Sequence, residues 1–293
     1  MSLGILGALG TITDSERRTA ASLTSRLGSA PALALDRDNA RRLAVPEETG
    51  PILDLFRLMG PTIADALGPT LETIGVGRRE RVDARSGSAV RNEIAAWAGA
   101  LGLAEFELYV GGKDANLIQG IPGEMPSMVL GSAVKTPLSL SDRARLVREL
   151  VALERGTTIV MLRDDVSVAA VIVASCAIAD VPLASPAYAV LAEIQRQMSK
   201  AVTRKVKKVL PEVAQAVARS QPDLRAFRGH ALRTLDRAAA IAAGDPSAAI
   251  LQIVGEHAAA EKIANDPRAT SMLRFLWSDD YFALRKQLGL GIG

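Results

Sequence analysis

Two adjacent stretches decide the fold: Pro126-Ser-Met-Val-Leu-Gly-Ser-Ala-Val134, and then Leu140-Ser-Asp-Arg-Ala-Arg-Leu-Val-Arg-Glu-Leu-Val-Ala152. The first is a short β-type run that ends in a turn. The second carries apolar residues at helical spacing, which predicts an amphipathic helix. The sequence therefore predicts a short strand followed closely by an amphipathic helix.

Glu149 in this helix stands where a zinc peptidase carries the Glu of a His-Glu-x-x-His motif. Such a site needs imidazoles at i and i+4 on one helix face, with the intervening Glu as general base. Here Arg148 and Ala152 occupy the two histidine positions. The sequence therefore predicts neither a catalytic residue nor a metal or cofactor at this place.

A second run, Leu232-Arg-Thr-Leu-Asp236-Arg237, precedes an Ala-rich helix that ends at Gly244. With the first helix, it resembles the gluzincin metallopeptidases of the CaaX-protease-like group, which take a third zinc ligand from a Glu four residues before an Asp. The resemblance implies a degenerate, zincin-like fold without zinc ligands. Its vestigial-site positions are Arg148, Glu149, Ala152, Leu232 and Asp236.

The resemblance also predicts one contact between these helices. In the family's fold, the Asp of the later helix hydrogen-bonds the first zinc-binding histidine and orients its ring. Arg148 and Asp236 hold the matching positions here, and opposite charges are costly to bury singly but tolerable as a bonded pair. We therefore expect the two helices to pack together and these side chains to form a direct ion pair.

From about residue 53 to 290, the chain is also similar to the uncharacterised C-terminal tails of large bacterial tetratricopeptide-repeat proteins. This similarity implies no activity, and the chain itself contains no repeat of 20 to 50 residues. The stretches that carry it are Glu105–Val110, Ala187–Glu193 and Ser278–Arg285.

The predicted fold class is α+β, predominantly helical, with a small antiparallel β-meander at about residues 104–131 packed on helices. Turn signals separate three β-type runs there, whereas Ala-rich segments of helical period fill most of the rest. We expect an N-terminal helical segment over 1–85 and a zincin-like domain over 86–293. Ser278 should cap a last helix that docks on this domain through Trp277, Tyr281, Phe282 and Leu284.

Composition favours a soluble protein: 48% of its 293 residues are hydrophobic, 3% are aromatic and the net charge is +3. Scarce aromatics and mild charge argue against nucleic acid as a partner. A single cysteine, Cys176, excludes an internal disulfide and suits a reducing compartment, so we expect a cytoplasmic location. The apolar run Val166–Ala179 is too short to cross a membrane and predicts a buried helix. Met1–Ile12 lacks a basic leader, so no signal peptide is expected.

The remaining chemical candidates are few. His230 and His257 have no further ligand at metal-binding spacing, so both are interpreted as ordinary surface or capping residues. Cys176 lies in an apolar helix and is expected to be a buried, inert thiol. A candidate anion-binding face, Lys200, Arg204, Lys207 and Lys208, lies on a helix expected to run from about Ala187 towards Pro211, although a solvated helix face gives the same pattern.

Three functions remain open from the sequence. The first is a non-catalytic zincin-like scaffold or protein-interaction module, with a protein or peptide partner that adds as a strand beside the small sheet. The second is a hydrolase or peptidase with a non-standard site that uses Glu149 as base. The third is an anionic-surface binder that acts through the Lys200–Lys208 helix face.

Overall fold

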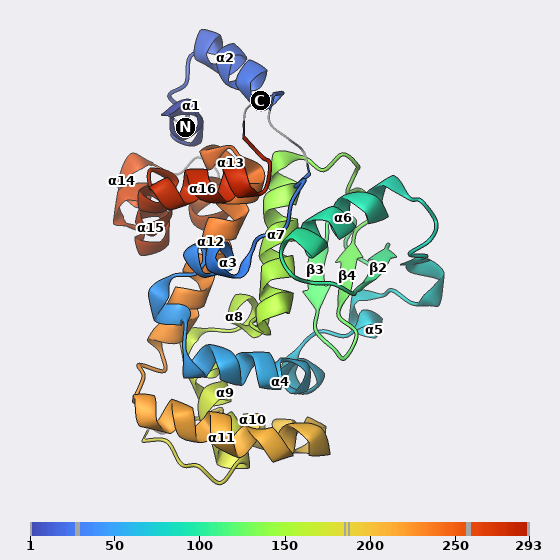
Figure 1. Cartoon of the computed structure of the whole chain (residues 1–293), viewed down its shortest axis with the longest axis vertical. Coiled ribbons are helices and arrows are strands. Elements are labelled where there is room, and N and C mark those ends of the chain that lie inside the picture. The colour runs from blue at the N-terminus through green and yellow to red at the C-terminus, as the bar shows by residue number, and fades with distance from the viewer. Residues whose placement is uncertain (1, 27–29, 185, 187, 256–258, 292–293) are drawn as a thin grey trace.

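Two long helices form the centre of the molecule in the computed structural model, which describes residues 2–26, 30–184, 186, 188–255 and 259–291. They are α7 (Leu140–Arg155) and α12 (Ala226–Ala243), and they pack side by side (Figure 1). Ser139 caps α7 by accepting a hydrogen bond from the Asp142 amide, and glycines in the left-handed conformation end both helices. The amphipathic helix predicted from the sequence is confirmed.

The close approach of α7 and α12 depends on small side chains. Ala144 of α7 and Ala239 and Ala243 of α12 are buried together in a cluster of their own. Alanine adds little bulk between two helix backbones, so the side chains that flank this seam are brought within reach of each other. The Ala-rich run of α12 thus positions the charged residues discussed below.

A four-stranded sheet lies on one side of α7 and is covered by α6 (Ala89–Ala100), as Figure 1 shows. The strand order is β1-β2-β4-β3. β1 pairs with β2 antiparallel, β2 with β4 parallel, and β4 with β3 antiparallel. The strands are β1 (Arg81–Val82), β2 (Glu107–Val110), β3 (Ile118–Ile121) and β4 (Ser127–Leu130), with η2 (Arg78–Glu80) and α5 (Leu71–Ile74) nearby.

The prediction of an antiparallel meander confined to about residues 104–131 is therefore wrong in two respects. The sheet is mixed, and β1 lies outside that range. After β2 the chain does not form a tight hairpin with β3 but contacts α5, where the Lys113 amide donates to the Ile74 carbonyl at 3.0 Å. It then crosses the end of β4 so closely that a Cβ at Gly131 would lie 2.2 Å from the Ala115 carbonyl oxygen. This crossing places β3 on the far side of β4.

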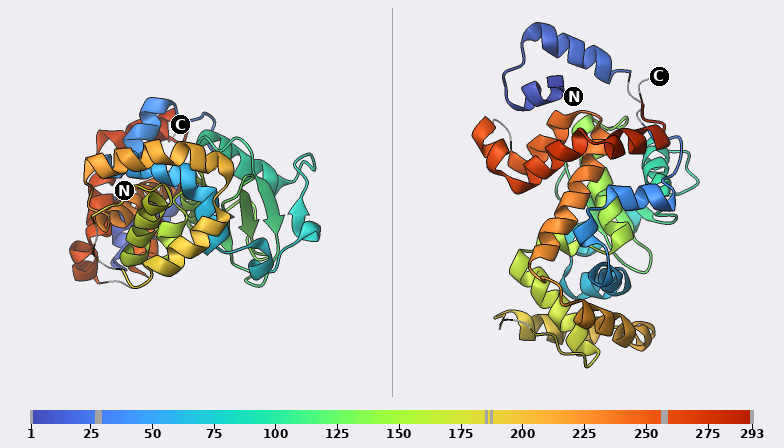
Figure 2. Two further views of the ribbon diagram at one scale, coloured as in Figure 1. Left: turned by 90° about the horizontal axis from the view of Figure 1, so that it is seen from below. Right: turned by 60° about the vertical axis from the view of Figure 1, so that its left-hand side comes forward.

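The remaining helices cover the two ends of the central pair (Figures 1 and 2). One end holds α4 (Pro51–Leu67), α8 (Ile159–Leu162), α9 (Asp165–Ile178), α10 (Leu191–Ala201) and α11 (Arg204–Ser220). The other end holds α1 (Ser2–Ala8), α2 (Asp14–Thr24), α13 (Pro246–Val254), α14 (Ala260–Asn265), α15 (Pro267–Leu276) and α16 (Asp279–Gln287), while α3 (Arg37–Leu43) and η1 (Pro46–Glu48) contact α12.

One large cluster of buried side chains includes residues on both sides of the expected boundary at 85/86. Phe56 of α4 and Phe227 of α12 stack with their ring centroids 4.9 Å apart. The boundary itself stays a prediction.

Helix α9 contains the apolar run predicted to be a buried helix, and its central residues are buried. Within the described part of the chain, no helix is both long enough and apolar enough to cross a membrane.

Candidate functional site

The predicted pair between α7 and α12 is present. Arg148 Nη2 lies 3.5 Å from Asp236 Oδ1, and the Arg148 and Asp236 side chains are 15% and 2% exposed, respectively. Asp236 is thus removed from water on the seam between the two helices. Both parts of the prediction, the packing of these helices and the direct ion pair, are confirmed.

Arg268 of α15 is a second and closer partner of Asp236. Its Nε and Nη2 donate to Asp236 Oδ2 and Oδ1 at 2.9 and 2.8 Å, the two-pronged geometry that a guanidinium forms with a carboxylate. Arg268 follows Asp266, which caps the start of α15, and Pro267. We call Arg148, Asp236 and Arg268 the Asp236 cluster.

The electrostatics of the Asp236 cluster differ between its two arginines. Burial lowers the pKa of Arg148, the charge of Asp236 opposes this effect only in part, and the like charge of Arg268 adds to the lowering. Burial is the largest single influence on Arg268 and acts to lower its pKa, but the hydrogen bonds to Asp236 and the charges of Asp236 and Asp266 together outweigh it, so that the pKa is raised. One buried carboxylate thus compensates two guanidinium groups, and it binds Arg268 more strongly.

Glu149, the neighbour of Arg148 on α7, contacts the sheet. Its Oε2 accepts a hydrogen bond from the Gly120 amide of β3 at 2.9 Å. Burial raises the pKa of the Glu149 carboxyl to about 7, although this hydrogen bond and the charges of Arg148 and Arg145 act to lower it. A Cβ at Gly120 would lie 2.8 Å from the Leu153 side chain, so glycine is what allows β3 to approach α7.

The other two vestigial-site positions are apolar and buried. Ala152 of α7 is fully buried, Leu232 of α12 is almost so, and both belong to the main hydrophobic cluster. Neither side chain has an atom that binds a metal, and the guanidinium of Arg148 would repel a cation. The described residues contain no group of three His, Cys, Asp or Glu side chains suited to a metal ion. These positions therefore do not fit zinc.

The cysteine and the two histidines considered in the sequence have different outcomes. Cys176 is buried, as predicted, and burial raises the pKa of its thiol to about 11, which keeps the thiol protonated and unreactive near neutral pH. His230 is half-buried on α12. His257 lies outside the described residues.

The prediction that one helix carries all four residues of the candidate anion-binding face is wrong. α10 ends at Ala201, and α11 begins at Arg204 after the cap residue Thr203. The separation arises because Val202 turns into the core while Thr203 accepts a hydrogen bond from the Val206 amide. Lys200 is thus on a different helix from Arg204, Lys207 and Lys208, and all four side chains are exposed.

The C-terminal helix α16 docks as predicted, but with fewer contacts than expected. Ser278 caps it by accepting from the Tyr281 amide, and Tyr281 and Leu284 are buried against the body. Trp277 and Phe282, which were expected to share in docking, are 55% and 54% exposed. Phe282 faces away from the core because Tyr281 and Leu284 occupy the apolar stripe of this short helix. Trp277 lies outside α16, at the C-terminal end of α15.

Sequence reasoning missed Arg268 and a buried ion pair between Arg155 and Glu48, whose Nη2 and Oε2 are 2.9 Å apart. The sequence Asp266-Pro267 does indicate a helix start, with a capping residue followed by proline. Nothing in that signal tells which helix the next side chain will reach. Of the two partners of Asp236, Arg148 was therefore predictable and Arg268 was not.

Comparisons of the chain with family models, with curated proteins and with solved structures gave no match. Function is therefore inferred from the arrangement of the chain's own residues.

Proposed function

We propose that this chain is a non-catalytic, zincin-like scaffold that serves as a protein-interaction module. The observation that carries the proposal is the Asp236 cluster. In the gluzincin fold that the sequence resembles, the Asp of the later helix holds a zinc-binding histidine. Here the residue at that position holds two arginines, Arg148 at 3.5 Å and Arg268 at 2.8 Å.

The physical role of this cluster is to join helices. Asp236 contacts α7 through Arg148 and α15 through Arg268, so one buried carboxylate connects three helices. Glu149 adds a link from α7 to the edge strand β3. Polar groups that serve chemistry in a peptidase are, under this proposal, retained because removing any of them would leave a buried partner unsatisfied.

A protein or peptide partner remains part of the proposal, but the place for it differs from the first expectation. Strand addition at β3 needs its outward amides, and the Gly120 amide is already bonded to Glu149. The opposite edge, β1, has only two residues. Exposed aromatic side chains such as Trp277 and Phe282 are the type that anchors protein interfaces.

The experiment that tests the absence of catalysis is a peptidase assay on the purified full chain. A library of fluorogenic peptides is incubated with the protein, with and without added zinc. The control variant is Glu149→Gln, because glutamine keeps the hydrogen bond from Gly120 and cannot act as a base. We expect the parent to show no turnover above that of this variant. Zinc-dependent turnover that disappears in Glu149→Gln would overturn the proposal.

A hydrolase that uses Glu149 is the second candidate, and one observation favours it. A carboxyl with a pKa of about 7 is matched to general-base catalysis near neutral pH. Burial is the one cause that raises this pKa, and it does so without any catalytic role for the carboxyl. The amide of Gly120 also occupies the Glu149 Oε2 atom. Turnover that needs Glu149 but no added metal would favour this candidate over the scaffold.

A further inference from the structure

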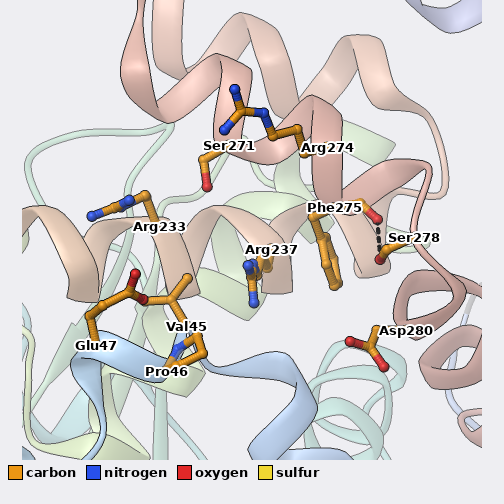
Figure 3. Close-up of a pocket in the computed structure, with 10 residues that line it drawn as sticks. All are labelled: Val45, Pro46, Glu47, Arg233, Arg237, Ser271, Arg274, Phe275, Ser278 and Asp280. Carbon is orange, nitrogen blue, oxygen red and sulfur yellow. Dashed lines mark hydrogen bonds between the residues drawn. The ribbon is translucent and has the colours of Figure 1, made fainter.

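A cavity of about 340 Å³ lies where α12, α15 and the segment around η1 meet (Figure 3). Three arginines line it: Arg233 and Arg237 from α12, and Arg274 from α15. Its volume is at the lower end of the range for small-molecule sites. None of its lining residues belongs to the Asp236 cluster.

Helical spacing explains why these side chains share one cavity. Arg233 and Arg237 are four residues apart on α12, so they lie on one face of that helix. Ser271, Arg274 and Phe275 follow the same rule on α15. The two faces look onto a common space, which the segment that includes Glu47 borders on another side (Figure 3).

Two of the three guanidinium groups are held in place by the backbone. Arg237 Nη1 donates to the Ala44 carbonyl at 3.1 Å, and its guanidinium carbon lies 4.9 Å from the centre of the Phe275 ring. Arg233 Nε donates to the Gly229 carbonyl at 3.3 Å. These contacts orient both groups, but none of them neutralises a positive charge.

Within the described residues, no carboxylate oxygen lies within the 4.0 Å ion-pair limit of any of these three arginines. The deeply buried Arg155, by contrast, is paired with Glu48 at 2.9 Å. Glu47 and Asp280 also line the cavity but remain beyond that limit. Burial lowers the pKa of Arg237, and the charges of these two carboxylates act against that shift.

We propose that this cavity binds a small organic phosphate monoester, with the phosphate between the three arginines. Guanidinium groups match the oxygens of a phosphate in charge and in geometry, and the Ser271 hydroxyl supplies a further donor. Glu47 and Asp280 would repel additional anionic groups, which limits the ligand to a single phosphate. The inference goes beyond the proposed scaffold role, and it is independent of zinc and of hydrolysis.

The test is calorimetric titration of the full chain with phenyl phosphate in a buffer without phosphate or sulfate. We expect saturable binding with one site. Arg233→Gln and Arg274→Gln should each weaken it by about tenfold, the factor expected when one charged hydrogen bond is lost. Arg274 is exposed, so its variant remains informative even if Arg233→Gln fails to fold.

The matched controls are Arg219→Gln and Lys207→Gln, which remove exposed cations from α11 outside the cavity. Both should leave the affinity unchanged. Absence of saturable binding, an equal loss in Lys207→Gln, or full affinity in both cavity variants would overturn the proposal. Equal affinity for benzoate would overturn the assignment of phosphate.

Discussion

The substitution Asp236→Asn tests the Asp236 cluster most severely, because it removes the charge and leaves the shape almost unchanged. Asn can accept from one arginine but cannot satisfy both prongs of Arg268 or neutralise Arg148. Loss of one partner from a buried ion pair costs about 3–5 kcal/mol of unfolding free energy. The side chains of Arg268 and Arg148 are 29% and 15% exposed and can partly rehydrate, so we expect the lower end, about 3 kcal/mol.

The assay is urea unfolding at pH 7, followed by circular dichroism, with thermal melting as a second probe. A loss of about 3 kcal/mol lowers the melting temperature of a protein of this size by about 5–10 °C. The matched control is Asp165→Asn, which breaks the exposed pair of Asp165 with Arg225, whose closest N to O distance is 2.6 Å. We expect a much smaller loss there because water replaces an exposed partner. Equal losses in the two variants, or less than about 1 kcal/mol for Asp236→Asn, would refute the reasoning.

The remaining predictions concern the neighbours of this cluster and the C-terminal helix. In double-mutant cycles with Asp236→Asn, Arg268→Met should show a larger coupling energy than Arg148→Met. The reason is that Arg268 has two short hydrogen bonds to the carboxylate, whereas Arg148 has one longer contact. The reverse order of coupling energies would contradict this geometry. The pKa of Glu149 is raised from 4.5 to about 7 in the folded state, so its contribution to stability is fully present below pH 4.5 and is lost as the pH rises through 7. Glu149→Gln should therefore gain stability relative to the parent between pH 5 and pH 8, by at most about 3 kcal/mol, and a difference that does not vary with pH would disprove the assigned shift. Leu284→Ala should cost about 2–4 kcal/mol and loosen α16, whereas Phe282→Ala should cost little, as measured by unfolding and by limited proteolysis; equal effects would show that the docking face is assigned wrongly.

The helices were largely predictable because their ends carry local chemical signals. Helix α4, for example, begins at Pro51 and ends at Leu67, since proline suits the first position of a helix and Gly68 follows the last residue. Ser278 marked the start of α16 in the same way. Such signals act over three or four residues, which is the distance over which sequence reasoning is strongest.

The sheet order was not predictable because it depends on a contact between distant segments. Gly131 reads as an ordinary turn residue, yet its missing Cβ is what lets residues 114–117 cross the end of β4. The candidate site likewise combines one contact that was predictable with one that depends on distant segments. The resemblance predicted Arg148 opposite Asp236, but the reach of Arg268 depends on how α15 is placed, which no local pattern sets.

Zinc binding by the purified full chain tests the central claim most directly. Calorimetric titration of the metal-free protein with zinc at pH 7, with melting temperatures recorded with and without chelator, measures whether the positions of Arg148, Ala152 and Leu232 hold a metal. We expect no binding at one equivalent and no change in melting temperature, because these side chains supply no donor and one carries a positive charge. Tight binding of one zinc ion per chain that is lost in Glu149→Gln or Asp236→Asn would contradict the account.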